Sequence, residues 1–344
     1  MIELIGDNLL NLLISLKLSD ANISHKIQIH PKITPSKSRC VALNLKSLQY
    51  LNLPTILFHP YREMIVGTNK NPMEFCINAH DFQLKLLGGI ATTEHIYHFL
   101  ESQLKNIESE KLKYSSEKMI KIASSSFFKP SSGVVQLGDA IELDVSTDEE
   151  WSETAFQLFS WPDILGFIPI SLKKHQLIWS SAQGWSTRNL SINNLQEKLS
   201  ILLKKTIMAG ATINSTSTPS PLFSYHASQY LLNDILVLGD AAHGFHPLAG
   251  QGLNHGIRDC DELIKILISN HKIDSFYLSK KLEAGCYLPN QLMKNSCEIM
   301  SKKIFSNLGS IPFKAFEKSA WIKKIILSIA EHQSWMSCDD SFKL

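Results

Sequence analysis

The stretch 235–267 has the residue types of a ligand-binding strand–loop–helix unit. A short apolar run of strand type ends at Gly239 and Asp240, and a loop rich in glycine and proline follows it. From about Leu253 onward, apolar residues recur at helical spacing, which predicts a helix. We therefore expect a strand, a loop, and then a helix whose first turn includes Gly252.

The chemistry that this unit offers is that of a helix N-terminus beside a carboxylate. The first turn of a helix presents unpaired N–H groups and the positive end of the helix dipole. Gly250 and Gly252 would let a ligand approach that backbone closely. Asp240 follows a strand, where open α/β sheets place ligand-binding groups, and its charge suits hydroxyl groups better than phosphate. The unit predicts a ligand with both hydroxyls and an electron-rich or anionic part.

Residues 1–31 predict a βαβ unit with an incomplete nucleotide-binding signature. Such a unit carries G-x-G-x-x-G after its first strand and an acidic residue at the end of its second strand. This chain has Gly6, but Asn8 and Asn11 stand at the later glycine positions and no acid ends the second strand. Asn8 could be tolerated through left-handed backbone geometry. Asn11 adds a side chain where we expect close packing of helix on strand.

Residues 140–181 predict an antiparallel sheet, because four runs of strand type alternate with turn residues. The aromatic side chains Phe156, Phe159, Trp161 and Trp179 could face an aromatic ligand. We expect at least half of them to form the core of the sheet instead, since that is the usual place of aromatic residues.

Composition excludes several classes of protein. With 344 residues, 44% hydrophobic and 19% charged, the sequence is that of an ordinary globular protein. A net charge of +2 argues against nucleic acid as a partner. The six cysteines and scattered histidines lack metal-ligand spacing, so we expect reduced thiols, no metal site and a cytoplasmic location. The basic, apolar segment 313–329 predicts either peripheral contact with the inner membrane or packing on the protein body.

The strings GDAAH at 239–243 and HPLAGQGLN at 246–254, with Arg258 and Asp259, resemble the second flavin motif of class A flavin-dependent monooxygenases. Within that class they most resemble the ubiquinone-biosynthesis hydroxylases. The resemblance implies an α/β fold in which a Rossmann-like FAD-binding domain is interleaved with a mixed or antiparallel β-sheet substrate domain, followed by C-terminal helices. The implied boundaries are 1–58, 86–135 and 222–274 for the FAD-binding domain, 59–85 and 136–221 for the substrate domain, and 275–344 for the helical region.

The resemblance also implies roles for individual residues. Asp240 would hold the ribityl and pyrophosphate region of FAD, and Arg39 would approach the pyrophosphate or the flavin edge. The expected cofactor-binding residues are Gly6, Arg39, Gly239, Asp240, Pro247, Gly250, Gln251, Gly252, Leu253 and Asn254. Of these, Pro247, Gly250 and Gly252 are expected beside the reacting part of the flavin.

The implied activity is hydroxylation of a prenylated phenol or quinol ring in ubiquinone biosynthesis, with FAD as cofactor, NAD(P)H as reductant and O2 as co-substrate. The family's Ala-Asp-Gly segment has no counterpart in this sequence, and the first glycine motif is incomplete. An alternative is therefore a non-catalytic scaffold that contacts other ubiquinone-biosynthesis proteins. We favour the enzyme, because the retained motif is dense with residues that only a flavin would require.

Overall fold

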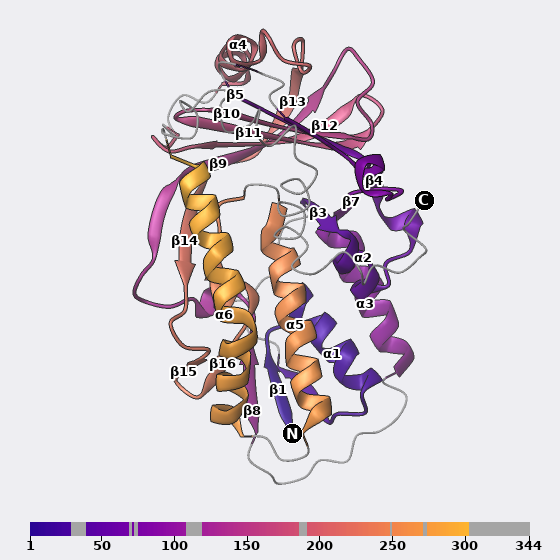
Figure 1. Ribbon diagram of the computed structural model, residues 1–344, viewed down its shortest axis with the longest axis vertical. Helices are drawn as coiled ribbons and strands as arrows, with labels where there is room; N and C mark the ends of the chain where they lie inside the picture. The colour runs from indigo at the N-terminus through magenta and orange to yellow at the C-terminus, as the bar shows by residue number, and fades with distance from the viewer. Residues whose placement is uncertain are drawn as a thin grey trace.

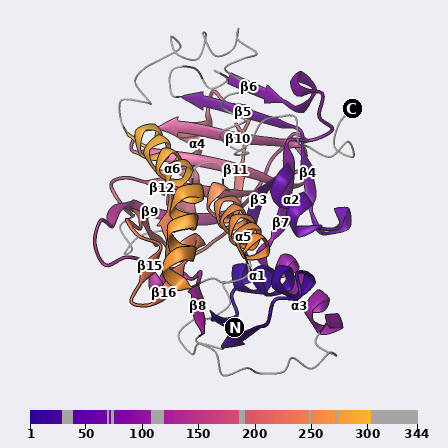
Figure 2. The same cartoon turned by 60° about the horizontal axis from the view of Figure 1, so that its bottom comes forward.

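The fold is seen in a computed structural model that describes residues 1–28, 39–68, 71, 75–107, 119–185, 191–247, 250–270 and 274–302. Two sheets lie toward opposite ends of the molecule, and two long helices run between them (Figure 1). These helices are α5 (Gln251–Ser269) and α6 (Ser275–Met300). They pack along each other in both views (Figure 2).

The first sheet has five strands and is mostly parallel. Its strands in spatial order are β15 (Leu231–Leu232), β16 (Ile235–Val237), β8 (Ile120–Ala123), β1 (Ile2–Ile5) and β2 (His25–Gln28). The pairs β1–β2, β1–β8 and β16–β8 are parallel, and β15 pairs antiparallel with β16. Helix α1 (Leu9–Asp20) crosses from β1 to β2 and is buried almost all round, as its apolar sequence requires. The predicted βαβ unit is confirmed.

The arrangement of these parallel strands creates a switch point. Along the chain, β1 is followed by β2 on one side of it, whereas β8 lies on its other side. Open α/β sheets bind ligands at such a point, beyond the carboxyl ends of the strands. Gly6, Ser124 and Gly239 directly follow β1, β8 and the β16 region at that edge. The sheet therefore brings three distant segments of sequence to one place.

The second sheet has nine strands and is mixed. Its main path runs β17 (His243–Gly244), β14 (Ser220–His226), β9 (Val135–Ser146), β12 (Lys174–Ser181), β11 (Asp163–Ser171), β10 (Thr154–Ser160), β5 (Glu63–Thr68) and β6 (Phe75–Asn78), with β13 (Thr212–Thr216) on β9. The β10–β5 pair is parallel and the other pairs are antiparallel. The predicted strands at 140–181 are confirmed as part of β9, β10, β11 and β12.

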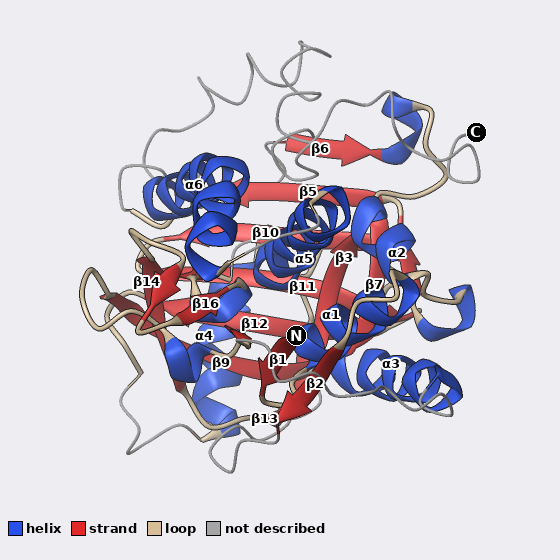
Figure 3. Cartoon of the chain, turned by 90° about the horizontal axis from the view of Figure 1, so that it is seen from below, coloured by secondary structure: helices blue, strands red, loops and turns tan. Residues whose placement is uncertain are grey.

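Helices cover the two faces of the nine-stranded sheet differently. Helix α4 (Ile192–Leu203) lies on the outer face and buries Leu195, Leu199 and Leu203 against it. Helices α5 and α6 lie on the inner face, as seen from below in Figure 3. No helix within the described ranges is both long and apolar enough to cross a membrane. The segment 313–329, on which the predicted membrane contact rests, lies outside the described residues.

A small third sheet joins the two larger ones. It consists of β3 (Cys40–Asn44), β7 (Gly88–Thr92) and β4 (His59–Tyr61), with α2 (Leu45–Leu51) and α3 (Thr93–Ile107) following β3 and β7. Thr92 accepts a hydrogen bond from the His95 N–H at 3.1 Å, so it caps the start of α3. β4 lies at the predicted boundary near residue 59 but pairs with β7 and not with the nine-stranded sheet.

Asn11 occupies the expected third glycine position without disturbing the helix–sheet contact. Its fully buried side chain donates hydrogen bonds to the carbonyl oxygens of Ile5 and Gly6 at 2.9 and 2.8 Å. Ser124 on the neighbouring strand donates to the Asn11 oxygen at 2.7 Å. Asn8 caps α1 with ordinary extended geometry, φ −69°, so the expected left-handed backbone at Asn8 was wrong. Both asparagines therefore act as hydrogen-bonding links between β1, α1 and the residue after β8.

We predict that Asn11→Ala lowers the free energy of unfolding by about 1–3 kcal/mol, because it removes buried hydrogen bonds from two carbonyl groups and one hydroxyl. Urea unfolding followed by circular dichroism measures this loss. Asn193→Ala, on the exposed face of α4, is the matched control and should change stability by no more than about 0.5 kcal/mol. Equal effects of the two substitutions would contradict the linking role of Asn11.

Candidate functional site

The switch point opens into a cavity of about 700 Å³. Its walls come from the start of α1, the residues after β8, the Gly239–Asp240 turn, and the first turns of α3 and α5. The lining residues that matter here are Asn8, Arg39, Ser124, Asp240 and Gly252. Arg39 is the one arginine or lysine among the described lining residues of this cavity, so it is the group there best suited to an anion.

A second cavity, of about 340 Å³, lies against the inner face of the nine-stranded sheet and is mostly apolar. Phe156 on β10 and Phe167 on β11 form a cross-strand pair on its wall, with ring centroids 5.9 Å apart. Met293 and Met300 of α6 close another side. No lysine or arginine stands among the described residues that line this cavity, so it is suited to an uncharged, apolar ligand.

Strand β3 and the start of α5 separate the two cavities. Arg39 and Val41 line the larger cavity, whereas Ala42 and Asn44 line the smaller one, as the alternation of a strand dictates. Asn254 holds this divide together. Its side chain accepts a hydrogen bond from the Asn44 N–H at 3.0 Å and donates to the Ala42 carbonyl at 2.9 Å.

The N-terminus of α5 is open to a ligand. Gly250 is the N-cap with a left-handed backbone, φ +63°, and it has no side chain to satisfy the first N–H groups of the helix. A Cβ added to Gly252 would meet no atom within 4 Å. The positive end of the helix dipole therefore lies at the cavities, where it favours negative charge on a bound group.

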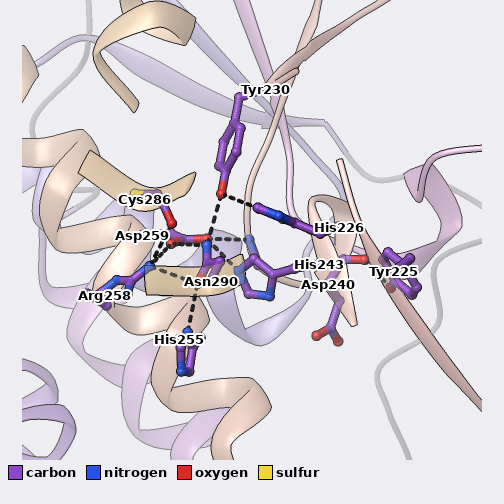
Figure 4. A network of polar contacts seen from close by, with 11 residues as sticks. Tyr225, His226, Tyr230, Asp240, His243, His255, Arg258, Asp259, Cys286 and Asn290 are labelled. Atoms are coloured by element: carbon purple, nitrogen blue, oxygen red, sulfur yellow. Dashed lines mark hydrogen bonds and ion pairs between the residues drawn. The ribbon is translucent and has the colours of Figure 1, made fainter. Parts of the chain in front are cut away.

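Asp240 stands at the wall of the larger cavity, with its carboxylate turned away from the neighbouring polar cluster (Figure 4). The side chain is exposed to the cavity. The surrounding protein atoms raise its pKa above the ordinary range by desolvation, while the charges of Arg39 and His243 act in the opposite direction. The Tyr225 hydroxyl donates to the Asp240 carbonyl at 2.6 Å and fixes the backbone of the turn. The carboxylate is left available to accept hydrogen bonds from ligand hydroxyls.

A fully buried carboxylate, Asp259 on α5, holds the turn that presents Asp240 (Figure 4). One of its oxygens accepts from the Gly239 N–H at 3.1 Å and from His243 Nε2 at 2.7 Å. The other accepts from the Arg258 guanidinium at 3.3 Å. Burial alone would raise the pKa of Asp259, but His243, Arg258 and the Gly239 N–H outweigh it and hold this pKa below its ordinary range.

The cluster continues into α6. Asn290 donates to Asp259 at 3.3 Å and to the Tyr230 hydroxyl at 2.9 Å, and its oxygen accepts from His255 and Arg258, both at 2.7 Å. Asn290, His255 and Asp259 are each fully buried. The turn before Asp240 is therefore fixed by α5, α6 and the segment after β14 at once.

His246 lines the smaller cavity beside Pro247. Its side chain is buried, and its Nδ1 atom has no hydrogen-bond partner. Burial lowers the pKa of His246 to about 4, so its imidazole is neutral near pH 7.

The structure places most of the predicted site residues at the two cavities. Arg39, Gly239, Asp240, Gly252 and Leu253 line the larger one, and Pro247, Gly250 and Gln251 line the smaller one. Gly6 and Asn254 line neither. Gly6 closes the turn after β1 with φ +94°. Asn254 uses its side chain to join α5 to β3.

Sequence reasoning missed the positioning groups. Asp259 and Ser124 contact Gly239 and the two residues Asn8 and Asn11, respectively. Asp259 stands in the flavin motif that the sequence resembles, but no role was predicted for it, and Ser124 stands in no predicted motif. The charged pair Arg258–Asp259 inside an otherwise apolar helical pattern was the available signal. Of the four aromatic residues considered for ligand contact, Phe156, Phe159 and Trp179 belong to the buried core, as was expected for at least half of them. Phe156 also borders the smaller cavity.

We predict that Asp259→Ala lowers the free energy of unfolding by about 3–5 kcal/mol, because it leaves buried donors on His243 and Arg258 without their carboxylate. Asp261→Ala, two residues away, removes an i,i+4 pair with Lys265 on the helix surface and should cost no more than about 0.5 kcal/mol. Urea unfolding of both variants decides the matter. A loss below about 1 kcal/mol for Asp259→Ala would show that the carboxylate does not hold the cluster.

The lowered pKa of His246 predicts a pH dependence of stability. The folded state keeps this ring neutral down to about pH 4, whereas the unfolded chain takes up a proton near pH 6.5. Stability is thus present above pH 6.5 and is lost as the pH falls toward 4. Between pH 7 and pH 5, wild type should lose about 2 kcal/mol more of its unfolding free energy than His246→Leu does. Parallel pH profiles of the two proteins would contradict a buried neutral ring.

Comparison with known proteins agrees with this geometry. Residues 153–272 match the family model of an FAD binding domain. The chain is 26% identical over 200 residues to the 3-demethoxyubiquinol 3-hydroxylase of Escherichia coli, covering 55% of this chain and 51% of that protein. It is 29% identical over 126 residues to the ubiquinone biosynthesis monooxygenase COQ6 of Schizosaccharomyces pombe, covering 34% of this chain and 26% of that protein. The chain thus matches about half or less of the length of these relatives.

Among solved structures, the chain resembles Klebsiella pneumoniae HpxO complexed with FAD and uric acid, with a TM-score of 0.70 and 13% identity over 96% of both chains. This likeness concerns the fold. The sequence matches show that residues 153–272 are similar to an FAD binding domain and that parts of the chain are similar to a hydroxylase and a monooxygenase of ubiquinone biosynthesis.

Proposed function

We propose that this protein binds FAD across its two cavities and hydroxylates a phenolic ring that carries an apolar, prenyl-type tail. The observation that carries this proposal is the meeting of a polar cavity and an apolar cavity at one helix start. A dinucleotide with a planar ring system needs both surroundings, polar for its phosphates and hydroxyls and apolar for its ring. The similarity to ubiquinone-biosynthesis hydroxylases supports the choice of a prenylated phenol or quinol.

The larger cavity fits the polar part of FAD. Arg39 supplies a positive charge, and the starts of α1 and α5 supply helix N-termini for the pyrophosphate. Asn8, at the start of α1, also lines this cavity. The Asp240 carboxylate suits the hydroxyls of a ribityl chain. The open space at Gly252 leaves room for the ring system to approach α5.

The family's glycine at position 11 is replaced by a residue that points into the protein. Because the Asn11 side chain forms hydrogen bonds with β1, Gly6 and Ser124, it leaves the cavity beside α1 open. The acidic residue that ends the second strand in the family, and that binds the adenosine ribose, has no equivalent among the described residues of the larger cavity. The acidic residues that line this cavity are Asp240 and Glu94, which lies at the start of α3. A weaker hold on the adenosine part of the cofactor is therefore expected.

The bound flavin supplies oxygen activation after reduction by NAD(P)H, and the chain's own residues prepare the site for it. The N-terminus of α5 stabilises negative charge on the ring beside Gly250 and Gly252. Pro247 and the apolar walls of the smaller cavity exclude water from the same place. Ile164 and Met293 belong to the apolar lining against which a substrate ring can lie.

The scaffold alternative lacks comparable support. A protein that had lost its cofactor could fill the two cavities with its own side chains, whereas here both are open. The proposal includes contact with the inner membrane, because a substrate with an apolar tail must be delivered from a lipid phase. It also includes contacts with other ubiquinone-biosynthesis proteins.

We predict that the purified protein takes up one FAD and that Asp240→Ala weakens FAD binding at least tenfold, because the ribityl hydroxyls lose their acceptor. Flavin absorbance after gel filtration, and titration of apoprotein with FAD, measure this loss. Glu150→Ala, which removes an exposed acid remote from both cavities, should bind FAD like wild type. Wild-type protein that stays colourless with excess FAD would overturn the proposal in favour of the scaffold.

A further inference from the structure

Helix α6 exposes more large apolar side chains than any other described element. Fourteen such side chains are exposed within the described ranges, and six of them belong to this one helix. The remaining eight are spread over the molecule, with no more than two in any one helix or strand. Scattered apolar side chains are normal on a protein surface, whereas a cluster of them marks an interaction site. The six are Phe276, Tyr277, Tyr287, Leu288, Leu292 and Ile299.

Three of these side chains form a stripe along one face of α6. Leu288, Leu292 and Ile299 are 64%, 54% and 59% exposed, and their spacing of four and seven residues is that of one helix face. Tyr277 lies on the same face about three turns before Leu288. The stripe therefore follows most of the length of the helix, which lies at the front of the molecule in Figure 1.

The stability of the fold does not explain this stripe. The opposite side of α6 supplies the core contacts, where Leu278, Leu282 and Cys286 are buried in the cluster around the five-stranded sheet and Met293 in that of the nine-stranded sheet. Exposed helix positions can hold polar residues without any loss of these contacts. The outward face thus has a composition that folding alone does not require.

Lysine residues accompany the stripe. Residues 275–302 contain four lysines and two glutamates. Each glutamate is paired with a lysine of the same helix, at 2.6 and 2.8 Å. Of the other two lysines, Lys281 lies on the face of the stripe with its Nζ 5.6 Å from the centre of the Tyr277 ring, and Lys302 follows the end of the helix. The outward face therefore combines apolar side chains with a surplus of positive charge.

We propose that the outward face of α6 docks on a lipid bilayer that contains anionic headgroups. This inference rests on the proposed function, whose substrate carries an apolar tail, and it names the surface through which the protein meets the lipid. An amphipathic helix face binds a bilayer by burying its apolar side chains at the boundary of headgroups and acyl chains, while lysines attract anionic headgroups. Tyrosine suits this boundary, because its ring is apolar and its hydroxyl stays hydrated.

The same helix forms a wall of the smaller cavity. Met293, Cys297 and Met300 line that cavity, and they alternate along α6 with Leu292 and Ile299 of the stripe. Docking of the outward face would place this cavity wall beside the lipid. A substrate with an apolar tail would then have a short path from the bilayer to the site.

A second copy of the chain fits this face less well than a bilayer does. A helix of 26 residues is about 39 Å long and about 10 Å wide, so one face of it covers roughly 400 Å². A stable protein–protein interface buries about 800 Å² on each partner. A bilayer has no such requirement, because a row of inserted side chains and a few lysines are enough for reversible binding.

Sedimentation of the full-length protein with vesicles tests this inference. The vesicles consist of phosphatidylcholine, with or without phosphatidylglycerol. Wild type should bind the vesicles that contain phosphatidylglycerol, and the triple variant Leu288→Ser, Leu292→Ser, Ile299→Ser should bind them at least tenfold more weakly. Substitution of Lys281 and Lys302 by Gln should weaken the same binding by about fivefold for each lysine. All variants should take up FAD like wild type, because the changed residues line neither cavity.

The matched control removes three equally exposed apolar side chains from other elements. Ile56, Leu172 and Ile201 are 90%, 58% and 70% exposed, and their joint replacement by Ser should leave vesicle binding unchanged. Equal vesicle affinity of wild type and the α6 triple variant, or an equal loss in the control, would overturn the inference and leave FAD binding and the proposed function intact.

Two further results would also overturn the inference, and one would separate it from the proposed function. Self-association that the α6 substitutions abolish, in a protein that binds no vesicles, would assign the face to a second copy. Loss of vesicle binding on replacing Phe316, Trp321 and Ile325 by Ser, with the α6 variant binding like wild type, would assign the contact to segment 313–329. Wild type that binds vesicles through α6 but takes up no FAD would confirm the docking face and refute the proposed function.

Discussion

The site depends on one buried interaction, the contact of the Asp259 carboxylate with the Gly239 N–H and His243. A carboxylate that is fully removed from water is costly unless every oxygen is hydrogen-bonded. Here α5 supplies the carboxylate, and the turn after β16 supplies the donors. The cost of burial is offset only while the turn keeps its shape, so the position of Asp240 at the cavity wall is fixed by the core and not by the surface.

A few buried hydrogen bonds also hold the segments that separate the two cavities. Asn254 joins α5 to β3 through both ends of its amide, and the alternation of β3 then gives each cavity its own set of side chains. A single helix start can face a polar space on one side and an apolar space on the other. That combination, more than any single residue, is what a flavin with an apolar substrate requires.

The sequence predicted the elements that follow local rules and missed those that depend on distant partners. The strand–loop–helix around Asp240 could be predicted because glycine, proline and apolar spacing encode it locally. Asn11 was expected to disturb the packing of helix on strand. Its side chain instead donates to the carbonyl groups of Ile5 and Gly6 and accepts a hydrogen bond from Ser124, which lies more than a hundred residues away in the sequence. His246 could be placed in the motif, but only the tertiary structure shows that its buried ring lies beside the smaller cavity.

A crystal structure of the protein grown with FAD and 2-pentylphenol tests the account most directly. We expect FAD with its phosphates near Arg39 and Asn8, its ribityl chain at Asp240, and its ring over Gly250 and Gly252 facing the phenol. A dinucleotide bound elsewhere, or the two cavities filled by the chain's own side chains with no FAD present, would contradict it.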